Sequence, residues 1–115
     1  MTESTLDMLR RNVLSTVERL ESTDLPEDER DDYEDDVYTA TDFLGGSLDI
    51  EYTVSGHGEY LGATVTVTVG GPHVEVDTRR DMVIGYWGGE RWSASYEDVL
   101  GLDDYCSEIF ESMRG

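Results

Sequence analysis

The spacing of apolar residues divides the chain into segments of two kinds. Near the N-terminus they recur every three or four positions, as on one face of an α-helix, at Leu6, Leu9, Val13, Val17 and Leu20. Ser4 or Thr5 is placed to cap the start of this helix, and a break follows at residues 23–26, which end in proline. The pattern predicts a helix over residues 4–22.

A second helix is predicted over residues 30–44. Tyr33, Val37, Thr41 and Leu44 lie three or four positions apart, and Gly45-Gly46 is a typical helix end. The preceding residues are rich in acids, which favour a helix start because they interact with the positive end of the helix dipole. The same acids are also compatible with a solvated acidic linker.

From Leu48 onward the apolar period changes from three or four residues to two, which is typical of strands with one buried face. Short turns rich in glycine interrupt the alternation, so neighbouring strands are expected to pair antiparallel as a meander. The pattern predicts five strands between residues 48 and 96, at 48–54, 61–69, 73–77, 82–87 and 90–96.

The predicted registers can be tested against one another. Each hairpin can be paired so that its apolar residues share one sheet face, through Val54–Leu61, Val69–Val74, Asp77–Met82 and Gly85–Trp92. The four registers agree on which face is apolar, and this agreement favours the sheet. The ring of Trp92 is expected to cover the strand glycine opposite it, Gly85.

The last segment, residues 97–114, is predicted to be helical. Its apolar stripe consists of Val99, Leu102, Cys106, Ile109, Phe110 and Met113. Gly101 is expected to interrupt the segment, and Asp103 to cap the main helix. The sequence therefore predicts one α+β domain over residues 1–115. Its helices should pack on the sheet face that carries Val65, Val67, Val76, Val83 and Trp92.

The charge balance indicates the environment. The chain has 27 acidic and 8 basic residues, a net charge of −19, and every basic residue is arginine. Such self-repulsion destabilises a small domain in dilute buffer but is screened in concentrated salt. We therefore expect a cytoplasmic protein of a salt-accumulating halophile, archaeal for example, or of a virus infecting one. The N-terminus has no secretory signal pattern, and no apolar run is long enough to span a membrane.

Eight of the ten residues from 27 to 36 are acidic. This run suggests an alternative function, an acidic mimic of DNA that inhibits a DNA-binding or defence enzyme. Direct nucleic-acid binding is not expected, because no basic patch is present to neutralise phosphates.

The second sheet face differs between its two halves. The first two strands carry acids and threonines there, whereas the last three also carry large apolar groups. An apolar patch with a polar rim usually marks a partner or oligomer surface. The predicted interaction surface consists of His73, Glu75, Met82, Ile84, Tyr86 and Arg91. The alternative is that the second helix covers this face.

Residues that could carry chemistry do not form a recognisable site. His73, Glu75 and Asp77 share a strand face, but alternate residues lie about 6.5–7 Å apart, too far to share one metal ion easily. Cys106 is expected to be a buried thiol and His57 an exposed turn residue. No metal or other cofactor is therefore predicted.

The pattern favours a small non-catalytic accessory protein. We expect it to bind a protein partner, or a second copy of itself, through the surface around Met82, Ile84, Tyr86 and Arg91. A small-ligand binder or an enzyme is a further alternative, which predicts an enclosed pocket near His73, Trp87 or Cys106. Trp87 and Trp92 are otherwise expected in the core.

Overall fold

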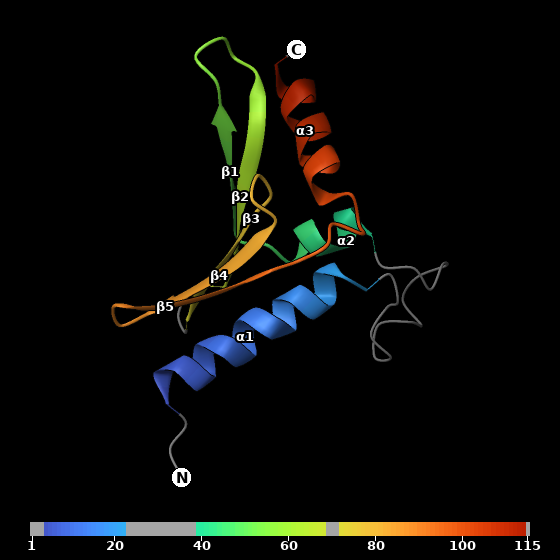
Figure 1. Cartoon of the computed structure of the whole chain (residues 1–115). Coiled ribbons are helices and arrows are strands. Elements are labelled where there is room, and N and C mark those ends of the chain that lie inside the picture. Colours follow the sequence, from blue (N-terminus) through green and yellow to red (C-terminus); the bar gives the residue numbers. More distant parts are fainter. Residues whose placement is uncertain (1–3, 23–38, 69–71, 115) are drawn as a thin grey trace.

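The computed structural model describes residues 4–22, 39–68 and 72–114, and Figure 1 shows their arrangement. Within these ranges the order of elements is α1 (Thr5–Leu20), α2 (Ala40–Gly45), β1 (Asp49–Val54), β2 (Tyr60–Thr68), β3 (His73–Asp77), β4 (Met82–Trp87), β5 (Glu90–Ser95) and α3 (Leu102–Met113). The strands form one antiparallel sheet in the order β1-β2-β3-β4-β5. The predicted α+β class and five-stranded meander are confirmed.

The two N-terminal helices begin at side-chain caps. Ser4 accepts a hydrogen bond from the Asp7 amide at 3.1 Å, so α1 starts where the sequence predicts. Thr39 and Asp42 form a reciprocal capping box at the start of α2, which Gly46 ends. The predicted second helix included residues 30–38, which lie outside the described residues.

The start of α3 is capped differently from the prediction. The N-cap residue is Gly101, with a φ of 69°, and it has no side chain to offer. The Asp98 carboxylate instead accepts hydrogen bonds from the amides of Leu102 at 2.7 Å and Asp103 at 3.0 Å. The prediction that Asp103 caps the helix is therefore wrong, and its carboxylate is free to bind elsewhere.

Two of the predicted hairpin registers are confirmed in full. Asp77 pairs with Met82, and Gly85 pairs with Trp92. Ladders without bulges join β3, β4 and β5, so the in-out alternation of the sequence carries over directly to these strands.

The other two registers are interrupted by bulges. In the first hairpin Tyr52 pairs with Ala63 as predicted, but Val54 pairs with Tyr60 and not Leu61. In the second, the predicted pairing of Val69 with Val74 implies that Val67 lies opposite Val76, whereas in the structure Val65 does. Each bulge adds an unpaired residue to β2, which periodicity alone does not reveal. Because the second offset is two residues, the apolar face is preserved.

The core lies between the sheet and the helices. Val65, Val76 and Val83 have no exposed surface, as predicted for the helix-facing side, while Val67 and Trp92 are partly buried. The helices contribute the fully buried side chains Leu9, Val13, Leu20, Leu102 and Cys106. In Figure 1, α1 runs along β4 and β5 while α3 stands beside β2, and the element contacts agree.

The contact between α1 and the sheet corrects two predictions about the tryptophans. A Cβ atom on Gly85 would lie 2.9 Å from Val13 Cγ2 and 3.2 Å from Leu9 Cδ2. Side chains of α1, and not the ring of Trp92, therefore fill the space above this glycine. Trp87 was expected in the core but is 46% exposed, because it lies at the end of β4, next to the Gly88-Gly89 turn.

Candidate interaction surface

The six residues of the predicted interaction surface lie together on three neighbouring strands. We call their side of the sheet the outer face, because α1, α2 and α3 pack on the other side. His73 pairs with Tyr86, Glu75 with Ile84, and Tyr86 with Arg91. The regular register of β3, β4 and β5 therefore brings these side chains into one area.

A carboxylate organises the centre of this area. Glu75 Oε2 lies 3.1 Å from His73 Nε2, and Glu75 Oε1 accepts a hydrogen bond from the Tyr86 hydroxyl at 3.3 Å. The rings of His73 and Tyr86 lie 5.8 Å apart between centroids. We call His73, Glu75 and Tyr86 the outer-face cluster. It holds two aromatic rings in a defined orientation on a partly exposed surface.

The electrostatics of the cluster favour a neutral phenol. Burial is the main effect that raises the pKa of Tyr86, and the Glu75 carboxylate raises it further. Arg91 lowers the same pKa, which shows that its positive charge acts on the cluster. Tyr86 therefore remains a hydrogen-bond donor near neutral pH, and Glu75 its acceptor.

Arg91 is exposed and has no carboxylate partner among the described residues. An exposed guanidinium beside an aromatic ring can bind a carboxylate from another molecule through two parallel hydrogen bonds.

The apolar content of the outer face is smaller than the sequence suggested. Ile84 is only 7% exposed, and Met82 is partly buried. Ile84 lies at the centre of the face, between Glu75 and Ser93 on the neighbouring strands, so its neighbours limit its exposure. The accessible groups are therefore mainly polar and aromatic. The short helix α2 does not cover them, since Ala40 and Phe43 belong to the core on the opposite side.

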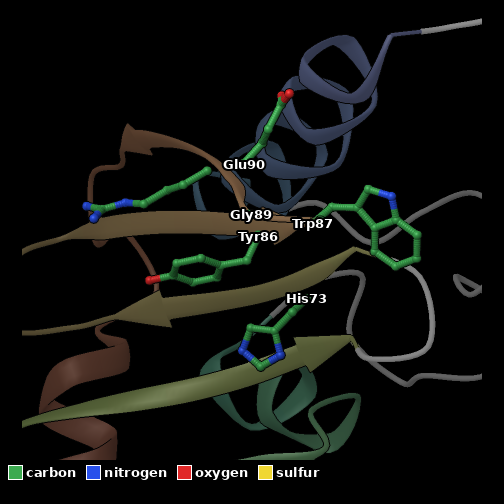
Figure 2. Close-up of a pocket in the computed structure, with 7 residues that line it drawn as sticks. His73, Tyr86, Trp87, Gly89 and Glu90 are labelled. Carbon is green, nitrogen blue, oxygen red and sulfur yellow. The ribbon is translucent and has the colours of Figure 1, made fainter.

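An open cleft of about 580 Å³ lies at the end of this surface that is nearest the Gly88-Gly89 turn. Its lining residues are His73, Tyr86, Trp87, Gly88, Gly89, Glu90 and Arg91. In Figure 2, the rings of His73 and Tyr86 lie close together, Trp87 extends past the strand end, and Glu90 is directed toward α1. The functional groups therefore diverge around the hairpin, unlike the converging groups of an enclosed ligand pocket.

The other residues considered for chemistry lie apart from this cleft. Asp77 accepts hydrogen bonds from the amides of Arg79 and Arg80 in the turn after β3. Within the described ranges, no group of three or more histidine, cysteine or acidic residues is placed to hold a metal ion. His57 is exposed in the first hairpin turn, as predicted.

Cys106 is fully buried, also as predicted. Burial, together with the charges of Asp103 and Asp98, raises the pKa of its thiol to about 11. The thiolate that acts as a nucleophile is therefore scarce at neutral pH.

A second polar cluster, which the sequence pattern does not reveal, lies between the sheet and α3. Asp103 Oδ1 accepts hydrogen bonds from the Tyr60 hydroxyl at 2.8 Å and the Thr78 hydroxyl at 2.7 Å. Thr78 Oγ1 also accepts a hydrogen bond from the Ala63 amide at 2.8 Å. We call Tyr60, Thr78 and Asp103 the inner network. Tyr60 reaches it only because the bulge in β2 turns this residue toward α3.

Comparisons with protein-family models, curated proteins and solved structures found no match. The described helices include none with the length and apolar character needed to cross a membrane. The acidic run 27–36 lies outside the described residues, so its use as a DNA mimic stays a prediction.

Proposed function

We propose that this chain is a non-catalytic binding protein that contacts a protein partner through its outer face. The observation that carries the proposal is the arrangement around Arg91. An exposed guanidinium without an ion-pair partner in the described chain lies beside the His73–Glu75–Tyr86 cluster. Tyrosine and arginine that are held in place are the residue types most often responsible for binding energy at protein interfaces.

The arrangement also suggests the chemistry of the partner. Arg91 favours a carboxylate, while the ring of Tyr86 and the side chain of Met82 favour an apolar or aromatic group beside it. The diverging lining of the cleft supports an extended contact more than the enclosure of a small molecule. A partner with an acidic residue next to an aromatic or aliphatic one fits this surface.

The proposal can be tested by affinity capture in multimolar KCl. Tyr86→Asp and Arg91→Glu should each abolish capture of the proteins that the wild type retains, because each removes a central contact. Arg114→Glu is the matched control, since it reverses the charge of an exposed arginine at the C-terminal cap of α3, outside the outer face. Partners retained equally by all four proteins would refute the proposed surface.

We also propose that the chain works in concentrated salt. The Debye length falls from about 10 Å at 0.1 M salt to about 3 Å at 1 M, so repulsion among the surface acids is strongly reduced. The midpoint temperature of thermal unfolding should therefore rise steeply between 0.1 and 3 M KCl. A midpoint that stays constant or falls over this range would contradict the proposal.

A further inference from the structure

The two outermost strands of the sheet differ in how their free edges are protected. Along a strand, successive amides point to opposite sides. The Tyr96 amide donates to the Asp81 carbonyl on the β4 side, so the amides of Arg91, Ser93 and Ser95 point away from the sheet. On β2, the Ala63 carbonyl accepts from the Thr78 amide on the β3 side, so Thr64 and Thr66 face β1. Their partners Glu51 and Asp49 therefore face β2, and the amides of Ile50 and Tyr52 point outward from β1.

The β1 edge carries the features that usually prevent pairing with another chain. Asp49 and Glu51 are exposed acids on this edge, and the β1–β2 ladder is interrupted by a bulge near Val54. β5 has neither feature in its middle. All six of its residues pair regularly with β4, and residues 93–95 are small. The β5 edge is thus open to another strand.

The open stretch of β5 has a defined end. The next amide with the same orientation is that of Glu97, and it donates to Glu21 Oε2 at 2.8 Å. The Glu21 side chain therefore covers this edge amide, while the outward amides of Arg91, Ser93 and Ser95 have no hydrogen-bond partner among the described residues. Ser93 is the midpoint of the open stretch.

The helix beneath this edge has a partly apolar outer flank. A cavity between α1 and the sheet is lined by Asn12, Thr16 and Arg19 of α1 together with residues of β2 and β3. The flank of α1 that carries these three residues therefore faces the middle of the sheet. At 100° per residue, Leu6, Arg10 and Leu14 lie on the opposite flank, toward the β5 edge. Leu6 is 49% exposed and Leu14 is 42% exposed.

The helix and the strand are also aligned along their lengths. Leu9 and Val13 contact Gly85, which pairs with Trp92, and Glu21 reaches Glu97. Between these two contacts, α1 rises about 15 Å along its axis and the strand from Trp92 to Glu97 extends about 16 Å, so the helix and the strand advance at nearly the same rate. On this scale Leu14 lies at the level of Ser93, so the centre of the exposed flank and the centre of the open edge coincide.

We propose that two copies of this chain associate about a two-fold axis that passes beside Ser93 and Leu14. Antiparallel pairing of the two β5 strands would form a continuous ten-stranded sheet, with the two α1 helices side by side beneath the junction. A second copy is the occupant that fits because the flank is self-complementary. Arg10 and Glu18 lie one turn before and one turn after Leu14, so each arginine faces a glutamate of the other copy.

The mass of the protein in 3 M KCl over a range of concentrations tests this dimer. The wild type should have twice the chain mass of 12.9 kDa. Leu14→Glu should weaken dimerisation at least tenfold, because it places two acids against each other at the axis. Ser93→Pro should do the same by removing an outward amide, while the ladder with β4 stays intact.

Leu48→Glu is the matched control, because Leu48 is 58% exposed at the opposite end of the sheet. It should leave the dimer unchanged, and far-UV circular dichroism should show that every variant is folded. A wild-type monomer at all concentrations overturns the proposal. So does a dimer that survives both Leu14→Glu and Ser93→Pro, or one that Leu48→Glu also disrupts.

A cross-link tests the register independently. Leu14→Cys should give a covalent dimer with a short bismaleimide, because the two residues meet at the axis, while buried Cys106 does not compete. Leu48→Cys should not give one. Cross-linking at residue 48 but not at residue 14 would place the interface elsewhere. Tyr86→Asp should leave the dimer intact, so failure of this proposal and failure of the outer-face proposal are distinguishable.

Discussion

The inner network and the outer-face cluster are built from similar parts but lie in different surroundings. In each, one carboxylate accepts a hydrogen bond from a tyrosine hydroxyl and is contacted by a second polar side chain. Asp103 does this between the sheet and α3, at 2.7–2.8 Å. Glu75 does it on the open side of the sheet, at 3.1–3.3 Å.

The difference shows how location decides the use of one chemical arrangement. Tyr60, Thr78 and Asp103 connect β2, the turn after β3 and the first turn of α3, so the inner network attaches a helix to the sheet. The outer-face cluster connects only β3 and β4, which already pair through their backbones. Its contribution to stability is therefore expected to be small, and we propose that its partly exposed rings contact a partner.

The largest difference is expected when each carboxylate is removed. Asp103→Ala leaves the hydroxyls of Tyr60 and Thr78 without their charged acceptor, and it should lower the free energy of unfolding by about 3–4 kcal/mol. Glu75→Ala, on a side chain that is 23% exposed, should lower it by less than about 1 kcal/mol. Urea denaturation at fixed KCl measures both values.

Asp104→Ala is the matched control for this comparison. Asp104 is exposed in the same first turn of α3 and loses the same favourable interaction with the helix dipole. If Asp103→Ala costs no more than Asp104→Ala, the inner network does not hold the helix to the sheet.

A smaller effect is expected from pH, and between pH 9 and 11 its main source on the inner side of the sheet is Cys106. The pKa of Cys106 rises from 9.0 to about 11 on folding, through burial and the nearby Asp103 and Asp98 charges. The thiol of the unfolded chain loses its proton at lower pH than the thiol of the folded protein. The free energy of unfolding is therefore unaffected by this thiol below pH 9 and falls as the pH rises from 9 to about 11. The loss should be about 2.7 kcal/mol, at 1.36 kcal/mol per pKa unit.

Urea denaturation between pH 8 and pH 11 tests this effect. The pKa values of Tyr60 and Tyr96 are raised as well, mainly by burial, so the decline should continue at higher pH. Cys106→Ala should be less stable throughout, because it leaves a cavity, but its decline between pH 9 and 11 should be shallower. An unchanged slope in that variant would show that Cys106 does not contribute.

The sequence predicted the outer-face cluster much better than the inner network. His73, Glu75 and Tyr86 lie on strands with uninterrupted alternation, so the period of two places them on one face. Tyr60 and Asp103 meet across 43 residues of sequence and depend on a bulge in β2 and on the Asp98 cap. Neither feature leaves a periodic signal. The sequence pattern also did not predict the burial of Ile84. Alternation assigns a residue to a sheet face but does not show how far its neighbours' side chains cover it.

The smallest expected effect comes from deleting a single hydroxyl in each cluster, and it is the most closely matched comparison. Tyr60→Phe and Tyr86→Phe each remove one oxygen that donates to a carboxylate and keep the aromatic ring. Tyr60→Phe should cost about 1–1.5 kcal/mol, because its acceptor Asp103 is partly buried between α3 and the sheet. Tyr86→Phe should cost less than about 0.5 kcal/mol, because water can replace the lost donor at Glu75. Equal costs would mean that the two carboxylates are equally accessible to solvent, and the outer-face cluster would then have to be regarded as part of the structural framework.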